Sequence, residues 1–192
     1  MSVLEDRLSQ AENEIRKPEF RQNRGMGNEV GYHIFSYAPD QELMVRAWTT
    51  YIEKKYADGS EGFIVQVFDL YDMMIDIPRQ KGFLDKCFDF EKQKGFDRII
   101  KAVGNTLRIT GEDNLLIKMI QNSVTDHSII FLTGIGKCYP VLRSHTVLNT
   151  MHQAIDKVPV VMLYPGKYSG QDLLLFGEIK DENYYRAFKL VD

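Results

Sequence analysis

Four short apolar runs, separated by segments with helical periodicity, constrain the fold of this chain more than any other feature. The runs are rich in β-branched and aromatic residues and cover residues 32–37, 63–68, 128–133 and 158–164. Strands that alternate with helices are joined by right-handed crossovers and form a parallel sheet covered on both faces. We therefore predict an α/β protein with a mainly parallel sheet flanked by helices, in Rossmann-like or P-loop-like layering.

The segments between and beyond these runs complete the predicted fold. Residues 2–17 have the spacing of an amphipathic helix that can be peripheral, and residues 82–104 suggest two short helices broken near Gly95. The C-terminal residues predict a closing β-hairpin with arms at 173–179 and 184–191. Four further helices are expected: from an N-cap at Asp40 to residue 56, from Asp69 to Ile77 before Pro78, over residues 112–124, and from Tyr139 to Asp156.

Composition places the chain among ordinary globular proteins. With 192 residues, 44% hydrophobic and 27% charged, it is expected to form one α/β domain over residues 1–192. A net charge of −3 provides no overall basic field for nucleic acid, so direct DNA binding is disfavoured. Cys87 and Cys138 belong to no CxxC motif, the N-terminus lacks a signal-peptide pattern, and no apolar run approaches the ~20 residues of a membrane span. These features predict a soluble cytoplasmic protein with no membrane association.

The loop after the third run invites comparison with a phosphate-binding loop. Ligands of open parallel sheets meet the loops at the carboxyl ends of the strands, and here Thr133 is followed by Gly134, Gly136 and Lys137. A Walker A loop needs four residues between its first glycine and Gly-Lys, then Ser or Thr, whereas one residue intervenes here and Cys138 follows. A structural tight turn is favoured over nucleotide binding, and nucleotide binding stays as the alternative.

Other candidate sites also have ordinary structural explanations. Asp69, Asp72 and Asp76 could share a helix face and hold a cation, but helix capping by Asp69 explains their positions better. His145 and His152 lie two helical turns apart, about 10 Å, too far for one metal ion. A thiol at Cys138 beside a lysine could be activated, although a buried structural thiol is commoner. No catalytic motif is found, and neither cofactor nor metal is predicted.

Two groups of residues are candidate contacts for a partner. Arg143 and His145 supply polar donors that suit an anion or a partner, with helix caps as the alternative. A C-terminal aromatic group can serve either as an interface or as core, because alternation in a hairpin would bury half of it. That group comprises Tyr164, Tyr168, Phe176, Tyr184, Tyr185, Phe188 and the neighbouring Arg186.

Three segments carry recognisable motifs: Gly25-Met-Gly-Asn-Glu29, the stretch from Phe131 to Asn149 and, most specific of all, Pro159 to Phe188. They resemble the motifs of the BrxB family, the small B component of bacterial BREX (bacteriophage exclusion) defence systems. The resemblance implies a defence protein made alongside an AAA-type ATPase, a DNA methyltransferase and an alkaline-phosphatase-like protein. It implies assembly with them and no enzymatic activity.

Three hypotheses follow. The first is a non-catalytic adaptor that binds other BREX proteins, the second is a degenerate P-loop-like nucleotide sensor at Thr133–Lys137, and the third is DNA contact by Arg16, Lys17, Arg21 and Arg24. The predicted partner- or ligand-binding residues are Gly134, Gly136, Lys137, Tyr139, Arg143, His145, Tyr164, Gly166, Tyr168, Gln171, Tyr184, Tyr185 and Arg186.

Overall fold

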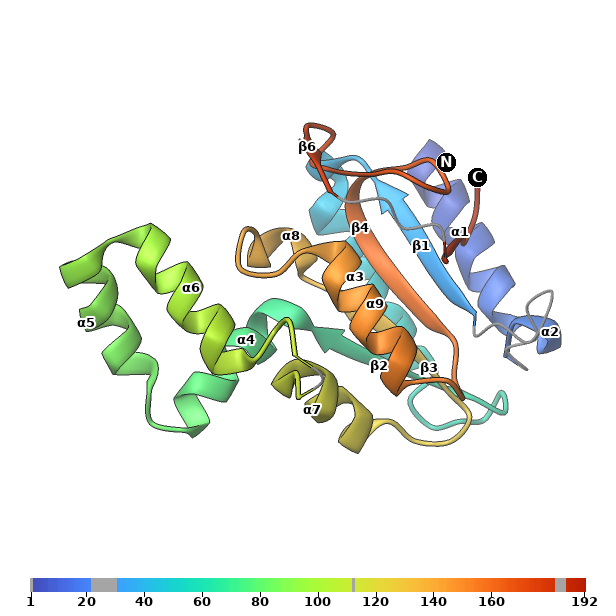
Figure 1. Cartoon of the computed structure of the whole chain (residues 1–192). Helices are drawn as coiled ribbons and strands as arrows, with labels where there is room; N and C mark the ends of the chain where they lie inside the picture. The colour runs from blue at the N-terminus through green and yellow to red at the C-terminus, as the bar shows by residue number, and fades with distance from the viewer. Residues whose placement is uncertain (1, 22–30, 112, 182–185) are drawn as a thin grey trace.

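A parallel sheet with helices on both faces forms the centre of the protein (Figure 1). The structure, a computed structural model, describes residues 2–21, 31–111, 113–181 and 186–192. The strands lie in the order β2-β3-β4-β1-β7, and every neighbouring pair is parallel. Their bounds are β1 Tyr32–Tyr37, β2 Ile64–Asp69, β3 Ser128–Thr133, β4 Val160–Tyr168 and β7 Phe188–Lys189. The predicted α/β class with a mainly parallel sheet is confirmed.

Alternating side chains on each strand divide the apolar core into two layers. On β3, Ile130 and Leu132 belong to the core on one face of the sheet, whereas Ile129 and Phe131 belong to the core on the other. This alternation follows from the two-residue repeat of a strand. Both faces are apolar because both are covered by helices, so the run reads as continuously hydrophobic in the sequence.

Two long helices cover one face of the sheet. Helix α1 (Val3–Arg16) begins with a capping box between Ser2 and Glu5, and it packs its apolar stripe into the same core as α3 (Glu42–Lys55). The short helix α2 (Pro18–Arg21) adds Phe20 to this core. The N-terminal helix is therefore integrated into the body of the protein.

The other face is covered by α4 (Leu70–Gln80), α7 (Leu115–Ser123) and α9 (Ser144–Ala154), with a one-turn helix α8 (Ile135–Cys138) before α9. Helices α5 (Leu84–Lys94) and α6 (Phe96–Leu107) form a hairpin that projects away from the sheet (Figure 1). We call this hairpin the arm. Gly95 separates its two helices with a φ of 81°, which confirms the predicted break.

Several predicted helix boundaries were wrong, and α7 begins at Leu115 rather than at residue 112. Asp40 lies inside a 3₁₀ turn, η1 (Pro39–Gln41), and α3 begins at Glu42. Pro78 lies in the last turn of α4, where it removes one backbone N–H donor and is followed by only two helical residues. Residues 139–143 are not helical, because Pro140 disfavours helical geometry at Tyr139, and α9 starts only at Ser144.

A C-terminal hairpin is present, but its turn lies inside the predicted first arm, and the predicted second arm was wrong. Strand β5 (Leu173–Leu175) pairs antiparallel with β4 and with β6 (Ile179–Lys180). The pairing with β6 follows from the turn at Phe176 and Gly177, which both have positive φ directly after β5. The segment 184–191 was expected to be the second arm. Instead, β7 within it pairs with β1 in a parallel register on another edge.

Candidate functional site

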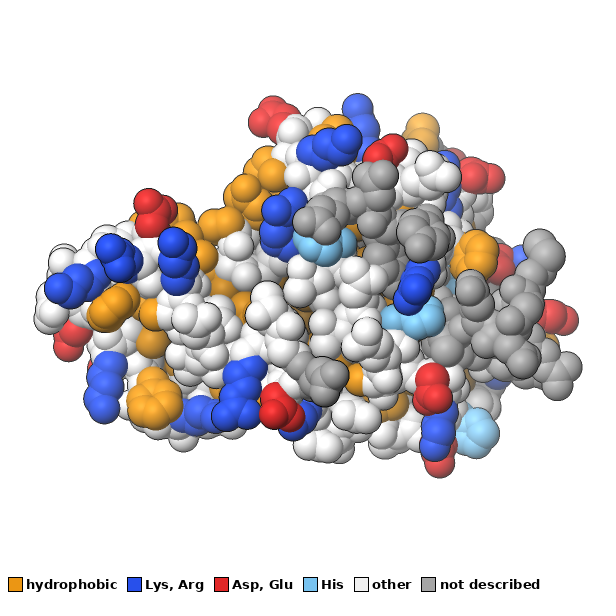
Figure 2. Space-filling view, in the orientation of Figure 1, with side chains coloured by type: hydrophobic (Ala, Val, Ile, Leu, Met, Phe, Trp, Pro, Cys, Tyr) orange, Lys and Arg blue, Asp and Glu red, His pale blue; other side chains and the backbone are white. Residues whose placement is uncertain are grey.

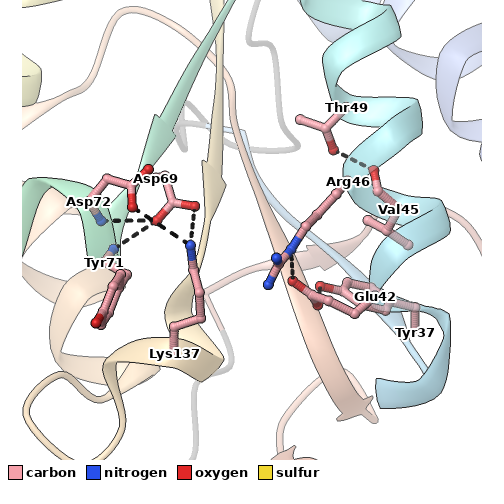
Figure 3. Close-up of polar contacts among 9 residues, drawn as sticks. All are labelled: Tyr37, Glu42, Val45, Arg46, Thr49, Asp69, Tyr71, Asp72 and Lys137. Carbon is pink, nitrogen blue, oxygen red and sulfur yellow. Dashed lines mark hydrogen bonds and ion pairs between the residues drawn. The ribbon is translucent and has the colours of Figure 1, made fainter.

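The loops at the carboxyl ends of the strands form a crevice at the point where the connections after neighbouring strands leave toward opposite faces of the sheet. Helix α3, which follows β1, covers one face of the sheet, and α8 and α9, which follow β3, cover the other. Strand β4 lies between these two strands. Such a topological switch point is the usual ligand crevice of an open α/β sheet. Figure 3 shows the charged side chains that converge there.

Asp69 is the centre of the first charged group in the crevice. Its side chain accepts hydrogen bonds from the backbone N–H of Tyr71 and of Asp72, at 3.0 and 3.1 Å, and so caps α4 as predicted. Lys137 Nζ lies 2.6 Å from Asp69 Oδ2 and 5.2 Å from the centre of the Tyr71 ring. The lysine that would hold a phosphate in a P-loop is therefore paired with an internal carboxylate.

Gly134 brings the α8 backbone against that carboxylate. Its φ is 77°, and a Cβ atom at this position would lie 2.4 Å from Asp69 Oδ1. Glycine is needed here both for the backbone conformation and for the close approach. The space above the turn is filled by Asp69, which supports the tight-turn interpretation of this loop over a phosphate cradle.

A second charged group faces the first across the crevice (Figure 3). Arg46 Nε donates to Glu42 Oε1 at 2.8 Å, and the Tyr37 hydroxyl donates to Glu42 Oε2 at 2.5 Å. Burial, with the hydrogen bond to Glu42, raises the pKa of Tyr37 far above its usual value. The Glu42 hydrogen bond likewise raises the pKa of Arg46. Each cation of the crevice is thus matched by a carboxylate of the protein itself.

Two small cavities lie between the charged groups. One, of about 260 Å³, is lined by Arg46, Lys137 and Phe176 among others, and the other, of about 210 Å³, by Arg46, Asp69 and Thr49 among others. A Cβ atom on Gly136 would lie 2.9 Å from both the Phe176 ring and the Pro165 side chain. The crevice is therefore polar on one side and closed by an aromatic ring on the other.

Arg143 and His145 converge on one buried carboxylate outside the crevice. Asp181, 7% exposed, has its Oδ1 atom 2.9 Å from the Arg143 guanidinium and 2.6 Å from His145 Nδ1, and its Oδ2 atom accepts from the His145 backbone N–H at 3.4 Å. His145 Nε2 lies 3.0 Å from Thr146 Oγ1. Because one carboxylate serves both side chains and the helix amide, the group joins α9 to the end of β6.

The remaining predicted binding residues occupy different environments. Tyr164 is fully buried, and Tyr168 is buried with its hydroxyl donating to Ala187 O at 2.8 Å. Burial raises the Tyr168 pKa to about 12. A Cβ atom at Gly166 would lie 2.2 Å from Leu174 O, so this glycine permits the pairing of β4 with β5. Those on the surface are Tyr139, Gln171 and Arg186, whereas Tyr184 and Tyr185 lie outside the described residues.

The described residues hold no group of three or more His, Cys, Asp or Glu side chains suited to a metal ion. Asp76, the third carboxylate of the predicted aspartate row, forms an ion pair with Arg79. His152 stacks on Tyr32 with ring centres 4.9 Å apart, away from the Asp181 group. Burial raises the pKa of Cys138 to about 12, which makes its thiol a poor nucleophile.

The basic residues near the N-terminus contact other parts of the protein. Arg16 is paired with Glu61 at 3.0 Å and Lys17 with Glu14 at 2.5 Å. The Arg21 guanidinium lies 5.1 Å from the centre of the Phe63 ring. Arg24, the fourth residue of this group, lies outside the described part of the chain.

Sequence reasoning missed two features that the structure brings forward. Glu42 and Arg46 stand four residues apart in a predicted helix, a spacing that signals an ion pair on one helix face. The arm residues from 84 to 103 repeat apolar side chains at helical spacing, which signals an amphipathic helix pair. Neither pattern reveals by itself that its side chains remain at the surface.

Comparison with known proteins places the sequence of this chain in a family. The family model described as BREX protein BrxB matches residues 66–190. The chain belongs to the BrxB family. It is 44% identical to a BREX protein BrxB of Bacillus cereus (strain H3081.97), over 100% of both chains. It is 31% identical to a BREX protein BrxB of Escherichia coli O9:H4 (strain HS), over 98% of this chain and 92% of the relative. The predicted resemblance is confirmed.

No solved structure matches the chain. Among the helices that the structure describes, none combines the length and the apolar character needed to cross a lipid bilayer. The BrxB family is named as a component of BREX defence, so the family name identifies the system in which the protein works.

Proposed function

We propose that this BrxB protein is a non-catalytic adaptor that binds larger BREX proteins. The partners expected from the family resemblance are the alkaline-phosphatase-like protein, the AAA-type ATPase and the methyltransferase. One observation carries the proposal: the charges of the switch-point crevice neutralise one another, while large apolar side chains remain exposed beside it. Tyr139 is 40% exposed and Phe176 39% exposed, at the rim formed by α8 and the β5–β6 turn.

Charged groups that pair with one another are less available to a small anionic ligand, whereas exposed apolar side chains favour contact with another protein. Lys137 and Arg46 each have a carboxylate partner within 3 Å, so neither is poised to hold a substrate phosphate without breaking an ion pair. Exposed aromatic residues contribute strongly to protein interfaces, since they bury large areas with little loss of side-chain freedom.

Binding to the co-encoded proteins tests the adaptor directly. The full chain is mixed with each purified BREX protein alone and with all of them together, and complexes are detected by size-exclusion chromatography with light scattering. Stable co-elution with at least one of them is the expected result. Absence of any complex, singly or together, would refute the adaptor.

A nucleotide-binding function is the second candidate, because the crevice lies at the position where open α/β sheets bind ligands. Calorimetry with ATP, GTP and dinucleotides on the wild type and on Lys137→Ala distinguishes the two functions. The adaptor predicts no saturable heat with any of these nucleotides. Saturable binding that Lys137→Ala abolishes would favour the nucleotide sensor instead.

A further inference from the structure

The arm leaves an apolar groove open on its inner side. Helix α5 has eleven residues and buries none of them fully, which is unusual for a helix of mixed polarity in a folded protein. Phe88 is 49% exposed and Phe96 is 59% exposed. Figure 2 shows apolar side chains along the boundary between the arm and the rest of the molecule.

Both arm helices direct one face into this groove. The lining residues of α5 are Leu84, Cys87, Phe88 and the charged Glu91, and those of α6 are Phe96, Ile99, Ile100 and Val103. Each set has the spacing i, i+3, i+4 and i+7, which marks one face of a helix. The groove has a volume of about 260 Å³, and α4 and the segment from Lys137 to Val141 form its base.

Helix α4 and the segment from Lys137 to Val141 close only the base of the groove, and its open side leaves Phe88 49% and Phe96 59% exposed. A single amphipathic helix fits such a groove, because its own apolar face would cover both helix faces together. Helix α5 is about 16 Å long, from a rise of about 1.5 Å per residue, so about three turns of a docked helix would cover it.

The charges around the groove indicate the polarity of the occupant. Residues 91–101, at the turn of the arm, contain four basic and two acidic residues: Glu91, Lys92, Lys94, Asp97, Arg98 and Lys101. Within the part of the chain that the structure describes, none of these four basic side chains forms an ion pair. Figure 2 shows lysine and arginine side chains over the arm.

We propose that the arm groove is the docking site for an amphipathic helix of a second protein, one with acidic residues at the end that lies against the α5–α6 turn. The inference rests on the proposed adaptor function, for which it supplies the surface and the partner chemistry. A second copy of this chain is the other possible occupant, and the oligomeric state measured below distinguishes it from a second protein.

Binding of each purified co-encoded BREX protein to variants of the full chain tests the docking site. Phe88→Ser and Phe96→Ser remove exposed groove side chains and are expected to leave the melting temperature near that of the wild type, while weakening binding at least about tenfold. Leu43→Ser is the matched control, since Leu43 is 77% exposed on α3 away from the arm, and it should bind like the wild type.

The charge requirement is tested separately. Lys92→Glu together with Lys94→Glu should weaken binding and reduce its dependence on salt, whereas Lys54→Glu on the exposed side of α3 should change neither. Equal binding by the wild type, the groove variants and the charge variants would overturn the docking site and leave the adaptor standing. If the wild type binds none of the proteins, the adaptor itself fails. A dimer that sedimentation detects and Phe96→Ser dissociates would assign the groove to a second copy and overturn the proposal.

Discussion

The partly buried His33 is expected to make the stability of the protein depend on pH. His33 lies on β1, with its ring 4.6 Å from the Phe20 ring and 6.0 Å from the Phe188 ring, measured between centres. Burial lowers its pKa from 6.5 to about 4, against smaller raising effects of a Gly31 backbone hydrogen bond and the Glu14 charge. Its neutral form is therefore favoured in the folded protein.

The sign and size of the effect follow from proton linkage. Between pH 6.5 and about 4 the unfolded chain binds a proton at His33 that the folded protein does not, so the free energy of unfolding falls as the pH falls. One pKa unit corresponds to 1.36 kcal/mol, and from pH 7.5 to pH 5 the loss due to His33 amounts to about 2 kcal/mol. Above pH 6.5 the contribution is constant.

Urea denaturation of the wild type and of His33→Phe measures this difference. Trp48, the one tryptophan of the chain, stacks near Phe35 and Phe131 and provides the fluorescence signal. The variant keeps an aromatic ring but cannot titrate, so its loss of stability from pH 7.5 to pH 5 should be smaller than that of the wild type by about 2 kcal/mol. Equal losses in both proteins would refute the assignment of a low pKa to His33.

Three further predictions concern packing and polar contacts. Gly134→Ala should lower the free energy of unfolding by about 1–3 kcal/mol, because φ is positive there and the new Cβ meets Asp69. Gly104→Ala, on α6, has no positive φ and meets its nearest atom at 3.7 Å, so it should lower that free energy less; equal urea midpoints would contradict this. Asp181→Asn should lower the free energy of unfolding by about 1–3 kcal/mol, because it removes the charge that accepts from the Arg143 guanidinium, the His145 ring and the His145 backbone N–H. The melting temperature should fall, and an unchanged melting temperature would contradict this role of Asp181. Leu107→Ala, at a fully buried position, should lower the free energy of unfolding measured by urea denaturation by about 3–5 kcal/mol. A decrease below about 1 kcal/mol would show that the surrounding core tolerates the cavity.

Local patterns predicted the elements of the fold well where one periodicity dominates. The run at 128–133 forms a strand with those bounds, and the break at Gly95 and the cap at Asp69 lie where their residue types indicated. These features are determined by residues close together in the sequence, so they can be predicted from the sequence alone. The helix expected to start at Tyr139 begins at Ser144 instead, because Pro140 disfavours helical geometry at the residue before it.

Features that depend on distant residues could not be obtained from the sequence. The pairing of Lys137 with Asp69 joins positions on two different loops, and the choice of β1 as the partner of β7 depends on the shape of the whole sheet edge. Burial of Tyr164 and Tyr168 also follows from the sheet order, because alternation alone leaves core and interface equally open. The neutralised crevice and the open arm groove emerge only when these long-range contacts are in place.

The position of β1 in the sheet has a consequence for how the protein is made in the cell. Its two neighbours, β4 and β7, begin at residues 160 and 188, so β1 has no partner strand until at least residue 160 has been synthesised. Meanwhile β2 and β3 can pair and gather their own helices. An apolar strand that stays unpaired during translation exposes the kind of surface that chaperones bind. Translation that stops before residue 160 would leave the edge of β1 open to intermolecular pairing.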